Sequence, residues 1–220
     1  MKIVYSLITL VFALVVTPSA EAQKKVSELT LVYDASISTG DNQPKLADAF
    51  DGATTTVYIK GTMSRSEMVS ALATFTTIHD SRTGDAVVLQ EISGQKLLIH
   101  MAAEDWKDKN KRYEGITFTN TAETKTIAGY SCIKAIATMK DGSTFSVYYT
   151  KDIIPENSDY NVQFRNLEGL PLEYELVQGK LKIKYTVSKI NMNPVPASKF
   201  DIPKGGYREL SYEESKKQGL

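Results

Sequence analysis

The side chains that could bind a metal or act as a nucleophile are few. His79, His100 and Cys132 are the only histidines and the only cysteine of the chain. A transition-metal site needs convergent ligands, and the sequence has neither a His-x-x-x-His pair nor a second cysteine to supply them. We therefore expect no metal and no cofactor. For His79-Asp80, a strand-end histidine beside a turn aspartate is a simpler interpretation than a catalytic dyad, and we assign His100 a structural role in a strand.

Covalent catalysis also lacks its usual signatures. The chain has no Gly-x-Ser-x-Gly turn to present a serine, and Gly205-Gly206 precedes no helical stretch of the kind that a phosphate-binding loop requires. Cys132 falls within a predicted strand on an apolar face, where a thiol keeps a raised pKa and reacts slowly. Carboxylate pairs of the glycosidase type can be assembled across strands, but Glu173 and Glu175 are assigned to lysine partners below. We predict no catalytic residue and a protein that is not an enzyme.

The elements that would position these residues are mainly short strands. Segments of alternating or continuous apolar character are separated by glycine turns, which is the pattern of β-strands. We predict strands at residues 29–37, 54–60, 72–79, 86–92, 96–101, 115–120, 130–139, 143–150, 172–177 and 181–190. Helix signals are limited to residues 102–113 around Trp106, 159–166 and 44–50. At no more than about three turns each, these helices can cover or line a sheet but cannot form a layer of their own.

Three glycine turns predict a strand register, because a two-residue loop fixes which residues face each other across a hairpin. For a loop at Gln178-Gly179, the predicted facing pairs are Leu176 with Leu181, Tyr174 with Ile183, Glu175 with Lys182 and Glu173 with Lys184. One face of this hairpin is apolar and the other is a ladder of opposite charges. The pattern predicts an edge hairpin with one polar, solvent-exposed face.

The other two loops predict hairpins that carry apolar groups on both faces. For a loop at Asp141-Gly142, one face collects Cys132, Ile136, Phe145, Val147 and Tyr149. For a loop at Ser93-Gly94, Glu91 faces Lys96 and Val87 faces His100. A sheet that is apolar on both faces is expected where it curves and something covers its concavity.

The N-terminus has the features of a secretory leader. Lys2 gives a basic start, Ile3–Val16 is almost entirely apolar, and Ala20-Glu21-Ala22 supplies a small-x-small cleavage pattern. As a helix, the apolar stretch would rise about 21 Å, which is short of the roughly 30 Å hydrocarbon core of a bilayer. We predict a signal peptide at residues 1–22, cleaved after Ala22, and a periplasmic or otherwise exported protein without stable membrane insertion.

The composition of the chain limits its partners. With 26 basic and 26 acidic residues the net charge is zero, and it stays zero after cleavage because the leader carries one of each, Lys2 and Glu21. Nothing in this balance indicates a nucleic-acid partner, and the basic run at residues 107–112 is interrupted by Asp108, as in a solvated surface. Residues 23–220 fit one domain. A single cysteine allows no internal disulfide, so stability must come from core burial and backbone pairing.

Several phrases, taken in order along the chain, resemble a known family. They are VYIKGTMSRSEM at residues 57–68, TKTIAGYSCIKA at 124–135, SVYYTKDI at 146–153, LEGLPLEYEL at 167–176 and FDIPKGGYREL at 200–210. Together they resemble the exported domains called DUF4412 and the related GLPGLI family of Gram-negative envelopes, whose fold is similar to that of the lipoprotein carrier LolA. The resemblance implies a mainly β (α+β) fold: a strongly curved antiparallel sheet forming a half-open barrel, with short helices covering its concave face and an apolar cavity between.

These observations leave three functions open. The leading one is a non-catalytic periplasmic binding or carrier protein that holds a lipid, acyl chain or other apolar ligand in the concavity of the sheet. The second is a structural or protein-interaction module of the cell envelope with a packed core, and the third is a hydrolase with a dispersed site. The candidate ligand-binding residues are Trp106, Tyr160, Phe164, Phe145, Val147 and Tyr149. In the second case they would complete the core, since an apolar lining and an apolar core look alike in a sequence.

Overall fold

The computed structural model describes residues 23–39, 52–178 and 181–219. The strands are β1 (Lys24–Val26), β2 (Glu28–Thr39), β3 (Thr54–Lys60), β4 (Met63–Val69), β5 (Ala73–Asp80), β6 (Ala86–Ile92), β7 (Gln95–Met101), β8 (Thr117–Ile127), β9 (Tyr130–Thr138), β10 (Thr144–Thr150), β11 (Ile153–Pro155), β12 (Leu170–Gln178), β13 (Leu181–Asn191) and β14 (Arg208–Ser211). The helices are α1 (Ala103–Lys109) and α2 (Tyr212–Lys217), with 3-10 turns η2 (Lys111–Tyr113), η3 (Ser158–Tyr160), η4 (Val162–Phe164) and η5 (Ala197–Phe200). The predicted signal peptide and the predicted helix at residues 44–50 lie outside the described residues.

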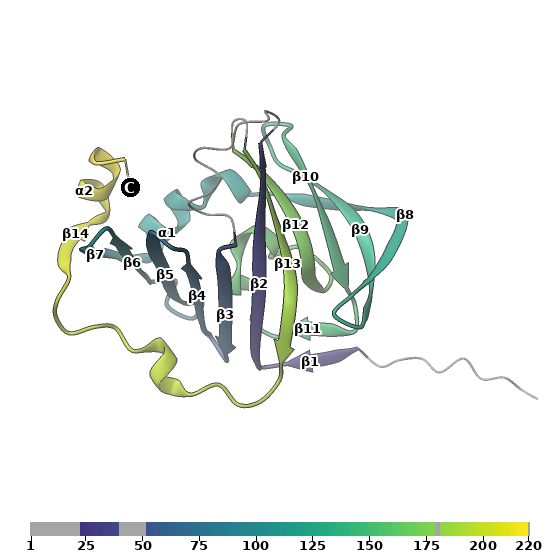
Figure 1. The fold of residues 1–220 in the computed structure, drawn as a ribbon, viewed down its shortest axis with the longest axis horizontal. Coiled ribbons are helices and arrows are strands. Elements are labelled where there is room, and N and C mark those ends of the chain that lie inside the picture. Colours follow the sequence, from purple (N-terminus) through teal and green to yellow (C-terminus); the bar gives the residue numbers. More distant parts are fainter. Residues whose placement is uncertain (1–22, 40–51, 179–180, 220) are drawn as a thin grey trace, which may run out of the picture.

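A mixed sheet of 12 strands dominates the fold, in the order β14-β7-β6-β5-β4-β3-β2-β13-β12-β10-β9-β8. Neighbouring strands are antiparallel except for β14, which runs parallel to β7, and a separate pair joins β1 to β11. The two edge strands, β14 and β8, do not pair with each other in the described part of the chain, so the sheet stays open. Figure 1 shows it curving from β7 round to β8, with the short helical segments beside it. The predicted mainly β fold is confirmed.

Every predicted strand is present, but four strands were not predicted from the sequence: β1, β4, β11 and β14. The sequence of β4, MSRSEMV, has no apolar alternation, and most of its residues are only partly buried. It is a strand because β3 and β5 pair with it on both sides. Backbone hydrogen bonds therefore define β4 where side-chain periodicity does not.

The predicted register of the Ser93-Gly94 hairpin is confirmed. Glu91 pairs with Lys96 in the ladder, and their side chains form an ion pair of 2.8 Å. Ser93 and Gly94 have φ angles of +48° and +83°, as a type I′ turn requires at both central positions. One face of β6 and β7 packs with Trp106 and Tyr212, and the other packs with Tyr207, so both apolar faces are covered.

The Gln178-Gly179 hairpin lies inside the sheet, with β13 beside β2 and β12 beside β10, so its predicted edge position is wrong. Its predicted register is also wrong, by two residues. Leu176 pairs with Ile183 rather than Leu181, and Tyr174 pairs with Tyr185. Gln178 stays in the ladder opposite Leu181, so it avoids the positive φ that the predicted turn would have imposed on it. A shift of two residues keeps every side chain on its own face, so the alternation of charged and apolar residues fits both registers equally well.

The predicted register of the Asp141-Gly142 hairpin is wrong by one residue, which exchanges the faces. Phe145 pairs with Ala137 and Val147 with Ala135, so Ile136 does not share their face. The loop has three residues because the Met139 N–H donates to the Ser143 carbonyl at 2.9 Å and Gly142 takes a φ of +81°. The Asp141 carboxylate also accepts from the Ser143 N–H at 2.9 Å, which stabilises this longer turn.

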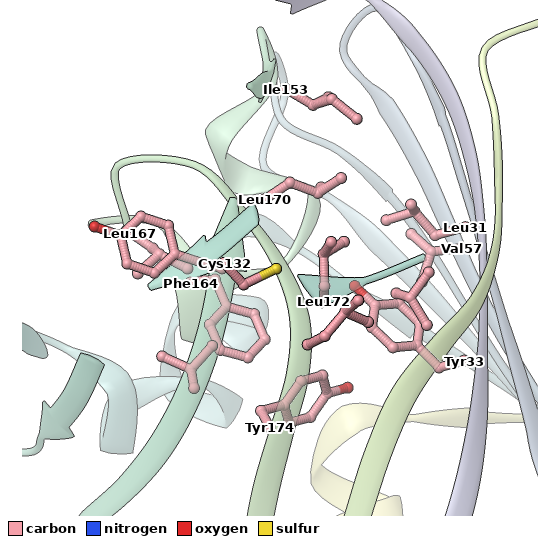
Figure 2. Packing of buried hydrophobic residues seen from close by; sticks show 14 of the residues in the cluster. Leu31, Tyr33, Val57, Cys132, Ile153, Phe164, Leu167, Leu170, Leu172 and Tyr174 are labelled. Atoms are coloured by element: carbon pink, nitrogen blue, oxygen red, sulfur yellow. The ribbon is translucent and has the colours of Figure 1, made fainter. Parts of the chain in front are cut away.

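The main core lies between β2, β3, β9, β10 and β12 and the segment that follows β11. Figure 2 shows Phe164 beside Tyr174, with Leu172 and Tyr33 next to them. The rings of Phe164 and Tyr174 are 4.9 Å apart at 65°, and Tyr33 and Tyr174 are 5.7 Å apart at 67°. The Tyr33 hydroxyl donates to the Pro171 carbonyl at 2.8 Å, which satisfies its polar end inside the core. No helix among the described residues has the length and apolar character needed to span a bilayer.

Candidate functional site

A pocket of about 770 Å³ lies where the end of β5 meets α1, η2 and the segment around η3 and η4. Its wall combines apolar side chains, chiefly Trp106, Ile116 and Val162, with polar and charged groups. Small-molecule sites typically have volumes of about 300 to 1,000 Å³ and a few polar groups among apolar ones. The pocket is therefore large enough for a ligand of ordinary metabolite or lipid size.

His79 and Trp106 form a stacked pair in the pocket wall. Their ring centroids are 5.0 Å apart and the ring planes differ by 27°. The His79 side chain is deeply buried at 4% exposure, opposite Ala86 in the β5–β6 ladder. Neither His79 Nδ1 nor Trp106 Nε1 has a hydrogen-bond partner among the described residues. Burial lowers the pKa of His79 from its usual value, which favours a neutral imidazole at pH 7.

Helix α1, which carries Trp106, is held at both ends. The Asp105 carboxylate accepts from the Ala102 N–H at 3.1 Å at its N-terminus. Near its C-terminus, Asp108 accepts from the Tyr212 hydroxyl at 3.0 Å and pairs with Lys216 at 3.1 Å, so α2 anchors α1. These contacts hold α1, and with it the backbone of Trp106, in place.

The turn between β5 and β6 comes very close to the start of α1. Gly84 has a φ of +82°, and a Cβ at this position would lie 2.8 Å from the Ala103 Cβ. Glycine is required both by the backbone conformation and by this approach. The close contact brings the end of β5, with His79, up to α1 and Trp106.

The opposite wall is formed by the segment that contains η3 and η4. Asn157 and Asn161 cap these turns, each accepting from a backbone N–H two residues later at 3.1 Å. The Asn157 side chain donates to the Thr62 carbonyl at 3.0 Å, and Asn166 donates to the Ile116 carbonyl at 2.8 Å. The helix predicted at residues 159–166 is thus a pair of 3-10 turns, because each asparagine cap starts a new turn.

Three of the four acidic residues that line the pocket, all except Glu104, are paired with cations. Glu114 pairs with Lys140 at 3.1 Å, Asp108 pairs with Lys216, and Asp159 pairs with Arg165. The lysine hydrogen bonds lower the pKa of Glu114 and of Asp108 from their usual values. These carboxylates are therefore ionised near neutral pH and are poorly suited to donate a proton.

The structure separates Trp106 from the other predicted ligand-binding residues. Trp106 lines the pocket, whereas Phe145, Val147, Tyr149 and Phe164 are buried in the main core and Tyr160 packs against it. The Tyr160 hydroxyl is buried without a hydrogen-bond partner among the described residues. Ligand contact by these six side chains stays a prediction. Sequence reasoning missed the place of His79 in the pocket wall, because nothing in the sequence links the end of β5 to Trp106.

Cys132 gives a first testable prediction. The side chain is fully buried, and burial raises the pKa of its thiol to about 11. Because only the thiolate is nucleophilic, a thiol reagent at pH 7 should label the native protein at least about 100 times more slowly than the urea-unfolded chain. Mass spectrometry of timed samples measures both rates. Equal rates would show that the thiol is accessible in the native state.

The sequence matches one protein family over residues 45–207, which include the strands of the sheet from β3 to β13 and the whole pocket wall. The chain belongs to the DUF4412 family. The family is described as a domain of unknown function, so membership assigns no ligand or reaction. For this DUF4412 chain the predicted family is confirmed, while the likeness to GLPGLI stays a prediction.

No curated protein matches this DUF4412 chain. A solved structure of PNGF-II is similar over 88% of the chain, with 13% identity and a TM-score of 0.50, but the chain spans only 33% of that protein. A LolA superfamily protein from Nitrosomonas europaea aligns with 10% identity and a TM-score of 0.35 over 83% of this chain and 93% of that one. The MucA/MucB complex of Pseudomonas aeruginosa aligns with 11% identity and a TM-score of 0.42, over 80% of this chain and 56% of the matched chain. The similarity to PNGF-II bears on the fold alone. The other two structures have TM-scores below 0.5.

Proposed function

We propose that this DUF4412 chain is an exported, non-catalytic binding protein that holds a small amphipathic molecule, an acyl chain with a polar end, in the pocket beside Trp106. The observation that carries the proposal is the pocket itself, about 770 Å³ with a wall of apolar and polar side chains. Export follows from the predicted leader at residues 1–22. An exported protein with such a pocket could carry acyl chains, because moving their apolar surface out of water is energetically favourable.

The charges of the pocket support binding rather than catalysis. A general acid–base pair needs a titratable group close to another that orients it or shares its proton. His79 Nδ1 has no hydrogen-bond partner in the described part of the chain, and the stacking partner of the ring is Trp106. The three acids named above are tied to cations. The pocket offers recognition groups without an assembled proton-transfer pair.

A second candidate function is a structural or protein-interaction module of the cell envelope. It is favoured by the packing of Phe145, Val147, Tyr149 and Phe164, which fill the region of the sheet where an acyl chain would otherwise enter. In that case an envelope protein would be the partner and the pocket would hold only water. The two functions differ in whether a ligand of a few hundred daltons stays bound to the folded protein during purification.

Native mass spectrometry of the exported protein tests this difference. We expect an adduct that is released when the protein unfolds, and we expect Val162→Phe to remove it by filling the pocket. The matched control is Val177→Phe, the same substitution at a residue that is 58% exposed at the end of β12. An adduct that persists in Val162→Phe would place the ligand elsewhere, and its absence from wild type and control alike would favour the interaction module.

A further inference from the structure

We infer that the free edge of β8 binds the β8 edge of a second copy of this chain, as an antiparallel pair related by a two-fold axis. The inference concerns a different surface from the pocket and does not rest on the proposed function. β8 is the last strand of the sheet, and within the described residues it pairs with β9 alone (Figure 1). It has 11 residues, whereas β14 at the other edge has 4.

The outer edge of β8 carries backbone groups that can pair with another strand. Along an antiparallel strand the N–H and C=O groups point alternately to its two sides, so part of those of β8 face away from β9. An open edge of this kind is a template for a further strand, and proteins usually block it with charged side chains, prolines or bulges. β8 contains no proline, and most of its residues are exposed. Apart from its bulge, only its charges could keep a partner strand away.

The two charged residues of β8 do not block this edge. Lys125 reaches over the sheet to Glu173 of β12 at 2.5 Å, and its ammonium lies 3.9 Å from the centroid of the Tyr148 ring. Both carboxylate oxygens of Glu123 accept from Lys134 of β9 at 2.9 Å. Because β9, β10 and β12 all lie on one side of β8 in the sheet, both charges are directed away from the free edge. A second strand would meet no unpaired charge there.

The bulge of β8 makes the edge self-complementary. The pairing with β9 is interrupted in the middle of the strand, which leaves regular runs at residues 117–120 and 124–127. An antiparallel pair centred on Ala122 sets each run against the other run of the second copy, and Phe118 then faces Thr126. The two charged residues face threonines in this register, so no like charges are opposed.

The same symmetry selects a second copy as the occupant of the edge. A two-fold interface uses one surface for both partners, so that surface has to match itself. In the register centred on Ala122 the bulges of both copies meet at the axis, where they interrupt the two strands at the same point. An unrelated extended segment would have to reproduce this break to pair with both runs.

Sedimentation equilibrium of the exported protein, over a range of about a hundredfold in concentration, tests the inference. We expect the average mass to rise from that of one chain to that of two. Ala122 is exposed, so Ala122→Lys and Ala122→Glu should keep the fold. Each variant opposes like charges at the axis and should weaken the dimer by about tenfold or more.

Mixing the two variants makes the test specific for the axis. An equimolar mixture of Ala122→Lys and Ala122→Glu should dimerise again, because opposite charges then meet. The matched control is Ala71→Lys, at an exposed position between β4 and β5, which should leave the dimer unchanged. A wild-type dimer that persists in both Ala122 variants would place the contact elsewhere and overturn the inference.

A disulfide cross-link gives a second measurement. Directly opposed residues of antiparallel strands have Cα atoms about 4.5 to 5.5 Å apart, which is within the range that a disulfide spans. Mild oxidation of Ala122→Cys should therefore yield a covalent dimer. Ala71→Cys should not, and Cys132 is buried and should not react in either variant. A mass of one chain at every concentration, without a cross-link, would overturn the inference, whether the edge stays free or takes an extended segment of a different protein.

Discussion

Replacing Gly169 with alanine will lower the free energy of unfolding by about 3 kcal/mol, the upper end of the usual range for overpacking. A Cβ on Gly169 would lie 2.1 Å from the Thr150 carbonyl oxygen and 2.8 Å from the ring of Tyr149. The residue is buried where β12 enters the ladder beside β10, so backbone rather than a flexible side chain must move. Urea unfolding followed by circular dichroism measures the change.

The matched control for Gly169 is Gly205→Ala. A Cβ on Gly205 meets no atom within 4 Å, and this glycine does not have a positive φ. The control should therefore change the stability by less than about 0.5 kcal/mol. If Gly169→Ala were as stable as the control, β12 could not approach β10 as closely as the structure shows.

Replacing Phe164 with alanine will cost about 3 to 5 kcal/mol of stability, the range for a buried aromatic ring. The ring packs against Tyr174, Phe145 and Phe118 at centroid distances of 4.9, 6.2 and 6.4 Å. Removing it leaves a cavity in the main core where η4 covers the sheet. The same unfolding experiment measures the loss.

Leu72→Ala is the control for Phe164, because Leu72 is 59% exposed and its truncation should cost less than about 0.5 kcal/mol. The comparison separates two roles that the sequence could not distinguish. A core residue lowers stability when it is truncated, whereas a ligand-lining residue would change binding with little loss of stability. If Phe164→Ala lowered the stability no more than Leu72→Ala does, Phe164 would be a ligand-lining residue rather than a core residue.

The strands could be predicted wherever side-chain alternation marks a face, and their registers only where the turn is unambiguous. Ser93-Gly94 set the register correctly because both residues take positive φ. Gln178-Gly179 did not, since a register two residues away preserves the same alternation. The polar strand β4 escaped prediction because its neighbours, rather than its own side chains, define it.

The candidate site was predictable only in part. Trp106 was a reasonable candidate as the single tryptophan within a short predicted helix, and it lines the pocket. The pairing of His79 with Trp106 depends on the approach of Gly84 to Ala103, a tertiary contact that leaves no local pattern. Phe145 and Val147 were assigned to an apolar face, which is true of core and lining residues alike.

The most direct test of ligand binding in this pocket is a titration of lipid-stripped protein with alkyl carboxylates of increasing length, followed by Trp106 fluorescence. Trp106 is the only tryptophan, so the signal comes from the pocket wall alone. We predict a saturable change in emission. Each added methylene should contribute up to about 0.8 kcal/mol, so affinity should rise by up to about fourfold per carbon until the pocket is full. Emission that shows no saturable change at any chain length would contradict the account.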